Sequence, residues 1–165
     1  MEGGDRQGFN MIPLFKVHMS ETIPEKVSKI LMSGYIGQGQ VVDDFEKVLK
    51  SHFGHDWLVT TNAATNAEHL ALHMLKKPTK VMEMNHTGDG AVTHSWNGIK
   101  DGEEVLCTPL TCTATNWPVL ANNFNIKWVD VDPKTLNMDL DDLARKITKN
   151  TKIIYLVHWG GYPID

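Results

Sequence analysis

Apolar residues recur along this chain with two different spacings. Spacings of three or four residues, typical of amphipathic helices, run from Ile23 to Leu31, from Val42 to Leu49 and from Leu140 to Ile147. Short apolar runs indicate strands at 104–109, 126–131 and 152–158, the last of which we expect to be buried on both faces. Strands that alternate with helices predict an α/β fold, with a mostly parallel sheet and helices on both faces.

The stretch 57–75 combines a strand, a turn and a helix. We predict a short buried strand at 57–61, a turn of small and hydroxyl residues at 62–66, and a helix to residue 75. The first turn of a helix has backbone N–H groups without a partner, and these can bind a phosphate. Small residues in the turn favour such binding, because a bulky side chain would keep the phosphate away from the N–H groups. The same residues also suit an ordinary connection capped by Asn or Thr.

A second hydroxyl-rich turn, 111–115, also follows a predicted strand. Both turns should therefore lie at the carboxyl edge of the sheet, where parallel sheets bind their ligands. This agreement favours a ligand site over two ordinary connections.

Three other segments lack a regular period. Residues 1–11 are rich in glycine and mixed charge, and we predict a flexible lead-in to a single folded region, 12–165. Residues 33–40 are a glycine-rich loop, which can approach a ligand or serve as a plain connector. Pro78 and several glycines and asparagines interrupt 77–98, which we predict to be a long surface-loop insertion.

Length, charge and cysteine content narrow the class of protein. The chain has 165 residues, enough for one domain with a core, and its net charge of −4 argues against a general nucleic-acid surface. No apolar run reaches membrane-spanning length, and the first residues lack the apolar core of a signal peptide. The two cysteines, Cys107 and Cys112, cannot form a Cys-rich metal site. We expect a reducing, cytoplasmic location without nucleic-acid or membrane partners.

Histidines occur in two groups that could be taken for metal ligands. His86, Asp89 and His94 lie in the predicted loop, where spacing is a poor guide to ligand geometry. His69 and His73 lie four residues apart on a predicted helix but lack the H-E-x-x-H arrangement. We therefore expect an ordinary solvated or packed histidine pair and no metal site.

Several short motifs follow one another between residues 12 and 165. They are Ile12-Pro13-Leu14, the glycine-rich 33–39, Phe45-Glu46, the small-residue turn and helix 63–72, 102–106, 109–116, 129–132, Asn137-Met138-Asp139 and 157–163 (Val-His-Trp-Gly-Gly-Tyr-Pro). Their order resembles the amino-terminal part of the pyridoxal-phosphate-dependent sugar aminotransferases of the DegT–StrS group. Only the predicted loop insertion lies outside the resemblance.

The resemblance implies a fold-type I enzyme that is a homodimer when full length. Residues 12–165 would be the incomplete amino-terminal part of its large domain. It also implies pyridoxal 5′-phosphate as the cofactor, with the Ala64 and Thr65 amides and the Thr65 hydroxyl on its phosphate. Cys112 occupies the position of an aromatic residue that stacks on the pyridine ring in relatives; a cysteine can contact a ring but cannot stack on it. Ala63 and Ala64 replace a serine and a glycine of the family, and alanine would resist a positive φ.

The resemblance also indicates which catalytic groups this chain lacks. In the family, the aspartate that pairs with the pyridine nitrogen and the lysine that forms the Schiff base lie downstream of the strand that precedes His158. We therefore expect the chain alone not to catalyse transamination. The reaction implied for the whole protein transfers an amino group from glutamate to a keto-sugar nucleotide, as in perosamine synthesis.

Two alternatives stay open. The protein could be a cofactor-binding or dehydratase-like relative that lacks the lysine, or a non-catalytic α/β fragment. A nucleotide-binding domain has little support, because no G-x-G-x-x-G or P-loop sequence follows any predicted strand.

Overall fold

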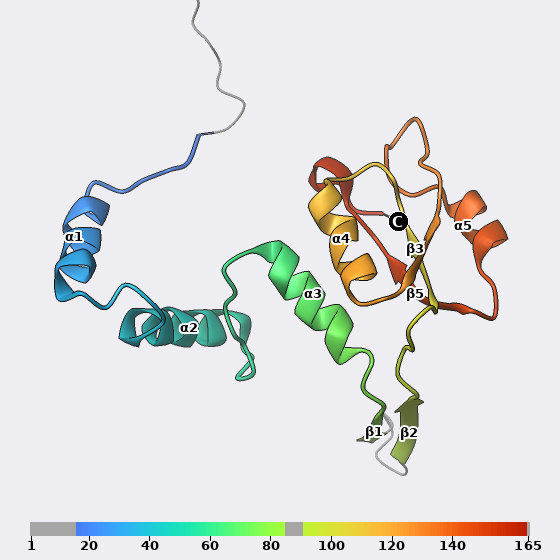
Figure 1. Cartoon of the computed structure of the whole chain (residues 1–165), viewed down its shortest axis with the longest axis horizontal. Helices are drawn as coiled ribbons and strands as arrows, with labels where there is room; N and C mark the ends of the chain where they lie inside the picture. Colours follow the sequence, from blue (N-terminus) through green and yellow to red (C-terminus); the bar gives the residue numbers. More distant parts are fainter. Residues whose placement is uncertain (1–15, 85–90, 165) are drawn as a thin grey trace, which may run out of the picture. The chain divides into compact units, whose positions relative to one another are not determined.

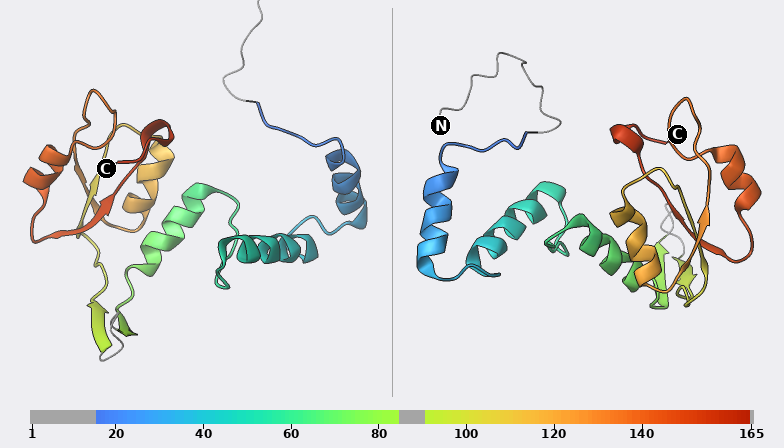
Figure 2. Two further views of the ribbon diagram at one scale, coloured as in Figure 1. Left: turned by 180° about the vertical axis from the view of Figure 1, so that it is seen from behind. Right: turned by 45° about the horizontal axis from the view of Figure 1, so that its top comes forward.

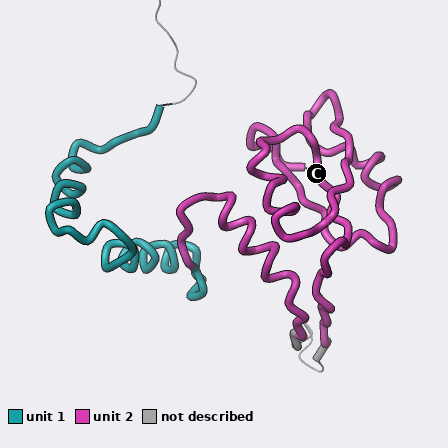
Figure 3. The backbone as a smooth tube through the Cα atoms, in the orientation of Figure 1, with its two compact units in different colours: residues 1–58 teal, residues 59–165 magenta. Residues whose placement is uncertain are grey.

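The computed structural model describes residues 16–84 and 91–164, which divide into two compact units between Leu58 and Val59 (Figure 3). The predicted lead-in lies outside the described residues, as do His86 and Asp89. No helix among the described residues combines the length and the apolar character needed to cross a membrane.

The first unit contains two of the predicted helices, α1 (Ile23–Ser33) and α2 (Gln40–Phe53). Each ends at a glycine in the left-handed conformation, Gly34 with φ 77° and Gly54 with φ 65°. The glycine-rich loop connects them, as predicted. Neither helix has a buried residue, so its apolar face stays open to solvent within this unit.

The second unit is built on a parallel sheet with the strand order β4–β3–β5. Its strands are β3 (Glu104–Cys107), β4 (Asn125–Trp128) and β5 (Thr151–Tyr155). The central strand pairs through Val105 with Ile126 on one side and with Ile153 on the other. The predicted α/β fold with a parallel sheet is confirmed.

Helices cover both faces of this sheet, because β3 points its side chains alternately into two apolar clusters (Figures 1 and 2). On one face lie α3 (Ala64–Met74) and α4 (Thr113–Ala121), and on the other lies α5 (Leu140–Lys146). The cluster under α3 and α4 is made of Leu72, Ile99, Val105, Cys107, Val119 and Phe124. The cluster on the α5 side is made of Leu106, Val129 and Met138, with Leu143 packed against it. A short 3₁₀ turn, η1 (Trp159–Gly161), follows β5.

Two strand predictions were wrong in part. Residues 57–61 form no strand: Trp57 is 90% and Val59 68% exposed. No strand of the described part pairs with this segment, and a short apolar run without a partner gains no ladder hydrogen bonds. β5 does form, but Ile154 stays 42% exposed, because the strand lies at one end of the described sheet and is not covered on both faces.

The predicted loop insertion contains a β-hairpin, so the prediction of an irregular loop was also wrong. β1 (Thr79–Met84) and β2 (Ala91–Trp96) are antiparallel, with Thr79 opposite Trp96. The glycines and asparagines that interrupt the period lie between and beyond the two strands, not within them.

Candidate functional site

The N-terminus of α3 presents backbone N–H groups to solvent. The carbonyl oxygen of Ala63, the residue before the helix, accepts hydrogen bonds from the N–H groups of Asn66 (3.1 Å) and Ala67 (3.2 Å). The N–H groups of Ala64 and Thr65, and the Thr65 hydroxyl, have no hydrogen-bond partner within the described part of the chain. An alanine at the cap position offers no side-chain oxygen to these amides, which costs the helix about 1 kcal/mol relative to Ser or Asp. The amides are therefore available to an external anion.

The alanines of this turn need no left-handed backbone. Ala63 is extended, with φ −158° and ψ 151°, and Ala64 is already helical. The turn is closed instead by the Thr61 hydroxyl, which donates to the Ala63 carbonyl at 2.9 Å, and by Asn66, which donates to Asn62 Oδ1 at 2.6 Å. The expected conflict between alanine and a positive φ therefore does not arise.

The second predicted turn leads from β3 into α4. Cys112 is the residue before the helix, and its thiol is exposed and free. The Thr111 hydroxyl donates to Thr115 Oγ1 at 3.1 Å, and the Asn116 side chain donates to the Thr108 carbonyl at 3.1 Å. These two bonds hold the turn closed while the Cys112 thiol stays accessible.

One buried side chain, Asn122, joins α3 to the end of α4. Its Nδ2 group donates to the His69 carbonyl at 3.1 Å and to the Pro118 carbonyl at 2.8 Å, and its Oδ1 atom lies 3.3 Å from His73 Nδ1. The two helices therefore pack side by side with their C-terminal ends together, and both N-termini lie at the same end of the unit (Figures 1 and 2).

The last residue of β5 also reaches α3. The Tyr155 side chain lies close enough to the carboxylate of Glu68, on α3, for that carboxylate to affect its pKa. Burial, and after it this carboxylate, raises the pKa of Tyr155 above its ordinary value of 10.0. The contact places the first half of α3 beside the carboxyl end of β5. The structure thus brings Ala64, Thr65 and Cys112 to the carboxyl edge of the sheet, while their roles toward a cofactor stay predictions.

A buried asparagine that sequence reasoning did not select holds the turn after β5. The Asn137 side chain makes three hydrogen bonds, with the Trp159 N–H (2.9 Å), the Tyr162 carbonyl (3.2 Å) and the Pro163 carbonyl (3.3 Å). In the same turn the Ile164 N–H donates to His158 Nδ1 at 3.2 Å, so a neutral His158 carries its ring proton on Nε2. The motif Asn-Met-Asp was the available signal, but nothing local shows that its asparagine contacts residues more than 20 positions away.

The second cysteine, Cys107, lies buried on β3. Burial raises the pKa of the Cys107 thiol to about 12, so it stays protonated and is no nucleophile at neutral pH. No group of three or more His, Cys, Asp or Glu residues that could hold a metal ion occurs among the described residues.

The chain is similar to a sugar aminotransferase and to two proteins named for their action on GDP-sugars. The solved sugar aminotransferase CalS13 from Micromonospora echinospora is 43% identical, with a TM-score of 0.70, over 94% of this chain and 36% of that one. A GDP-4-keto-6-deoxy-D-mannose 3-dehydratase from Yersinia pseudotuberculosis is 30% identical over 93% of this chain and 35% of the relative. A GDP-perosamine synthase from Escherichia coli O157:H7 is 28% identical over 93% of this chain and 36% of the relative. The chain thus spans about a third of the length of these relatives.

The family comparison covers nearly the whole chain. The sequence pattern shared by the DegT/DnrJ/EryC1/StrS aminotransferases matches residues 17–165, including both turns at the carboxyl edge of the sheet. Solved members of this fold carry the same cofactor that the resemblance implied. The chain therefore belongs to the DegT/DnrJ/EryC1/StrS aminotransferase family, which depends on pyridoxal 5′-phosphate.

Proposed function

We propose that this chain is the amino-terminal part of an aminotransferase that acts on a keto-sugar nucleotide, and that the N-terminus of α3 holds the phosphate of its cofactor. The observation that carries the proposal is the pair of available N–H groups at Ala64 and Thr65, at the carboxyl edge of the sheet. Similarity to CalS13 and to the GDP-perosamine synthase supports amino transfer to a sugar nucleotide. Glutamate is the proposed amino donor.

The proposed roles follow from what each group can donate or cover. The Ala64 and Thr65 N–H groups and the Thr65 hydroxyl donate to phosphate oxygens, assisted by the positive end of the helix dipole. The methyl side chains of Ala63 and Ala64 leave room for that approach. Cys112 covers one face of the ring through van der Waals contact. Bound pyridoxal phosphate supplies the electron sink for the change at the carbon–nitrogen bond.

A dehydratase is the second candidate. The 30% identity to the GDP-4-keto-6-deoxy-D-mannose 3-dehydratase supports it, although the identity to the sugar aminotransferase CalS13 is higher, at 43%. The two candidates share the phosphate site and differ in the residue that meets the cofactor, which we propose lies outside this stretch. On either candidate, the stretch alone does not catalyse the reaction.

The test uses the full-length protein. We expect it to take up pyridoxal phosphate and to show visible absorbance that borohydride bleaches if a lysine is linked to the cofactor. A lysine downstream of Asp165 together with bleaching supports the aminotransferase, and a histidine with bound but unlinked cofactor supports the dehydratase. A full-length protein that takes up no pyridoxal phosphate contradicts both.

Thr65→Val in the full-length protein tests the phosphate site itself. Valine keeps the shape but removes a hydrogen bond to a charged group, worth about 1.5–3 kcal/mol, so cofactor affinity should fall about 10- to 150-fold. The measurement is a pyridoxal phosphate titration followed by absorbance. Thr79→Val, at the start of β1, is the matched control and should bind as the wild type does. Equal affinity of the Thr65 variant and the wild type would remove this hydroxyl from the site.

A further inference from the structure

An asparagine followed by a glycine, Asn97 and Gly98, lies just beyond the end of β2. It is the only Asn-Gly pair in the sequence. Asn97 is exposed, and neither its side chain nor the Gly98 N–H has a hydrogen-bond partner within the part of the chain that the structure describes. The side-chain amide of Asn97 and the backbone nitrogen that follows it are therefore not held apart by other contacts.

The fold requires a glycine at position 98. Its φ of 76° lies in the left-handed region, and a Cβ atom there would overlap the carbonyl oxygen of Lys76. Because a glycine has no side chain, it also leaves its own backbone nitrogen unshielded. The backbone conformation at this point thus places the least shielding residue directly after an exposed asparagine.

We propose that Asn97 is a site of spontaneous deamidation, a reaction to which asparagine owes part of its thermal lability. The Gly98 nitrogen attacks the side-chain carbonyl carbon of Asn97 and closes a five-membered succinimide ring. The amide nitrogen leaves as ammonia, with the proton that the Gly98 nitrogen gives up. Water then opens the ring at either of its carbonyl carbons, which yields aspartate or isoaspartate. The reacting atoms belong to neighbouring residues, so their proximity favours ring closure.

Water reaches this pair through an open hollow of about 300 Å³. Besides Asn97 and Gly98, its lining includes Lys100, Glu103 and Lys152. The new carboxylate would therefore form beside a polar, solvated surface, and its charge alone should cost the fold little.

The isoaspartate product should loosen the base of the β-hairpin, because it adds a methylene group to the main chain. Before position 97, the Trp96 indole N–H donates to the Leu75 carbonyl at 2.5 Å. After it, the N–H of the buried Ile99 donates to the same oxygen at 3.0 Å. A longer main chain between these two donors strains at least one of the bonds. Conversion should therefore lower the unfolding temperature.

Ageing of the full-length protein at physiological temperature and pH tests the proposal. Peptide mass spectrometry locates deamidated residues, and labelling by an isoaspartyl methyltransferase detects isoaspartate. We expect Asn97 to convert faster than any other asparagine in 16–84 and 91–164, and the unfolding temperature to fall as it does so. Asn125 is the internal control, because it is also exposed but precedes a β-branched isoleucine and donates to the Gly102 carbonyl at 2.7 Å.

Asn97→Gln is the matched variant, because glutamine would have to close a six-membered ring and does so far more slowly. Fresh Asn97→Gln should melt as fresh wild type does, and it should keep its unfolding temperature on ageing. Conversion of Asn125 as fast as Asn97, or conversion of Asn97 in urea but not in the folded protein, would overturn the proposal. An equal fall in the unfolding temperature of aged wild type and aged Asn97→Gln would assign the loss of stability to a different lesion and contradict the proposed effect on the hairpin.

Discussion

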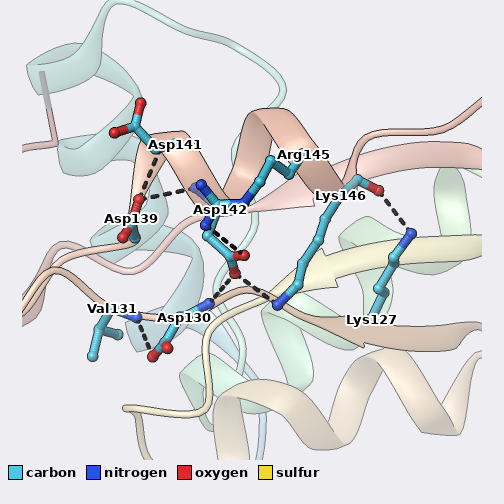
Figure 4. Close-up of polar contacts among 8 residues, drawn as sticks. All are labelled: Lys127, Asp130, Val131, Asp139, Asp141, Asp142, Arg145 and Lys146. Atoms are coloured by element: carbon cyan, nitrogen blue, oxygen red, sulfur yellow. Dashed lines mark hydrogen bonds and ion pairs between the residues drawn. The ribbon is translucent and has the colours of Figure 1, made fainter.

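The Asp142 carboxylate links α5 to the end of β4 (Figure 4). One of its oxygens accepts the Asp130 N–H at 2.8 Å and lies 2.6 Å from the Lys146 ammonium, and the other lies 3.2 Å from the Arg145 guanidinium. The hydrogen bond from Asp130, followed by the one from Lys146, lowers the pKa of the Asp142 carboxyl from 3.8 to about 2. The charged form is thus the one that the folded chain stabilises.

Asp142→Asn should lower the unfolding temperature at neutral pH, because asparagine keeps the shape but loses the charge. The folded-state pKa is depressed, so the stabilisation is complete above about pH 3.8 and is lost as the pH falls toward about 2. Melting curves of the wild type and the variant should therefore converge across that range. Asp141→Asn, at the exposed neighbouring position, is the control and should melt as the wild type does. If Asp141→Asn lowers the unfolding temperature as much as Asp142→Asn does, the contacts of the Asp142 carboxylate are not the cause.

Between elements, Asn137 connects the segment after β4 to the turn after β5. Asn137→Asp keeps the oxygen that accepts from Trp159 but removes the donor to the Tyr162 and Pro163 carbonyls. The buried side chain would then carry a charge that faces two carbonyl oxygens and has no donor to offer them, so the free energy of unfolding should fall by about 1–3 kcal/mol. Amide hydrogen exchange over 158–164 should also become faster.

An exposed asparagine provides the control for this change. Asn125 also donates from its side chain, to the Gly102 carbonyl at 2.7 Å, but it stays in contact with water. Asn125→Asp should therefore cost little. If the two variants lose the same stability, burial of Asn137 is not what makes the contact important.

Within the second unit, the segment that follows the β-hairpin passes close to the backbone that precedes it. Gly98 has φ 76°, and a Cβ atom there would overlap the Lys76 carbonyl oxygen. Gly102 has a similar φ of 81°, but the nearest atom to its Cβ would be 3.9 Å away. The two glycines therefore share the backbone requirement and differ in the space around them.

Gly98→Ala and Gly102→Ala separate these two effects. Gly102→Ala should cost about 1–2 kcal/mol from the left-handed backbone alone. Gly98→Ala should cost clearly more, because the overlap with a carbonyl can be relieved only by moving the chain. Chemical denaturation measures both free energies of unfolding. A smaller loss for Gly98→Ala would refute the close approach.

Across the whole molecule, each unit leaves large apolar side chains exposed. In the first unit Met32 is 85%, Tyr35 87% and Trp57 90% exposed, and in the second Ile154 is 42% exposed. We expect the chain alone to bind the dye ANS and to self-associate, because exposed apolar surface of this kind favours association. The measurements are dye fluorescence and light scattering after gel filtration. A full-length protein should bind less dye per molecule, and equal binding would contradict the expectation.

Periodicity predicted the elements well where the packing partner is close in sequence. The spacing from Leu140 to Ile147 predicted α5, and Asp139, directly before it, caps the helix by accepting the N–H groups of Asp141 and Asp142 at 2.9 Å. The glycines and asparagines of 77–98 were a poorer guide to secondary structure, because such residues occur both at the ends of strands and within loops. The hairpin was missed for this reason.

The sequence by itself determined the helices, the three parallel strands, the order of motifs that identifies the family and the small-residue turn at Ala64 and Thr65. All of these features can be read from patterns within a few residues. The spacing of apolar residues, for example, shows which side of a helix or strand is buried. Only the tertiary structure decided that 57–61 has no strand partner, that Asn137 holds the turn after β5, and that Asn122 joins α3 to the end of α4. The physical reason is distance along the chain: Asn122 and His73 are 49 residues apart, and their contact exists only because α3 and α4 pack side by side.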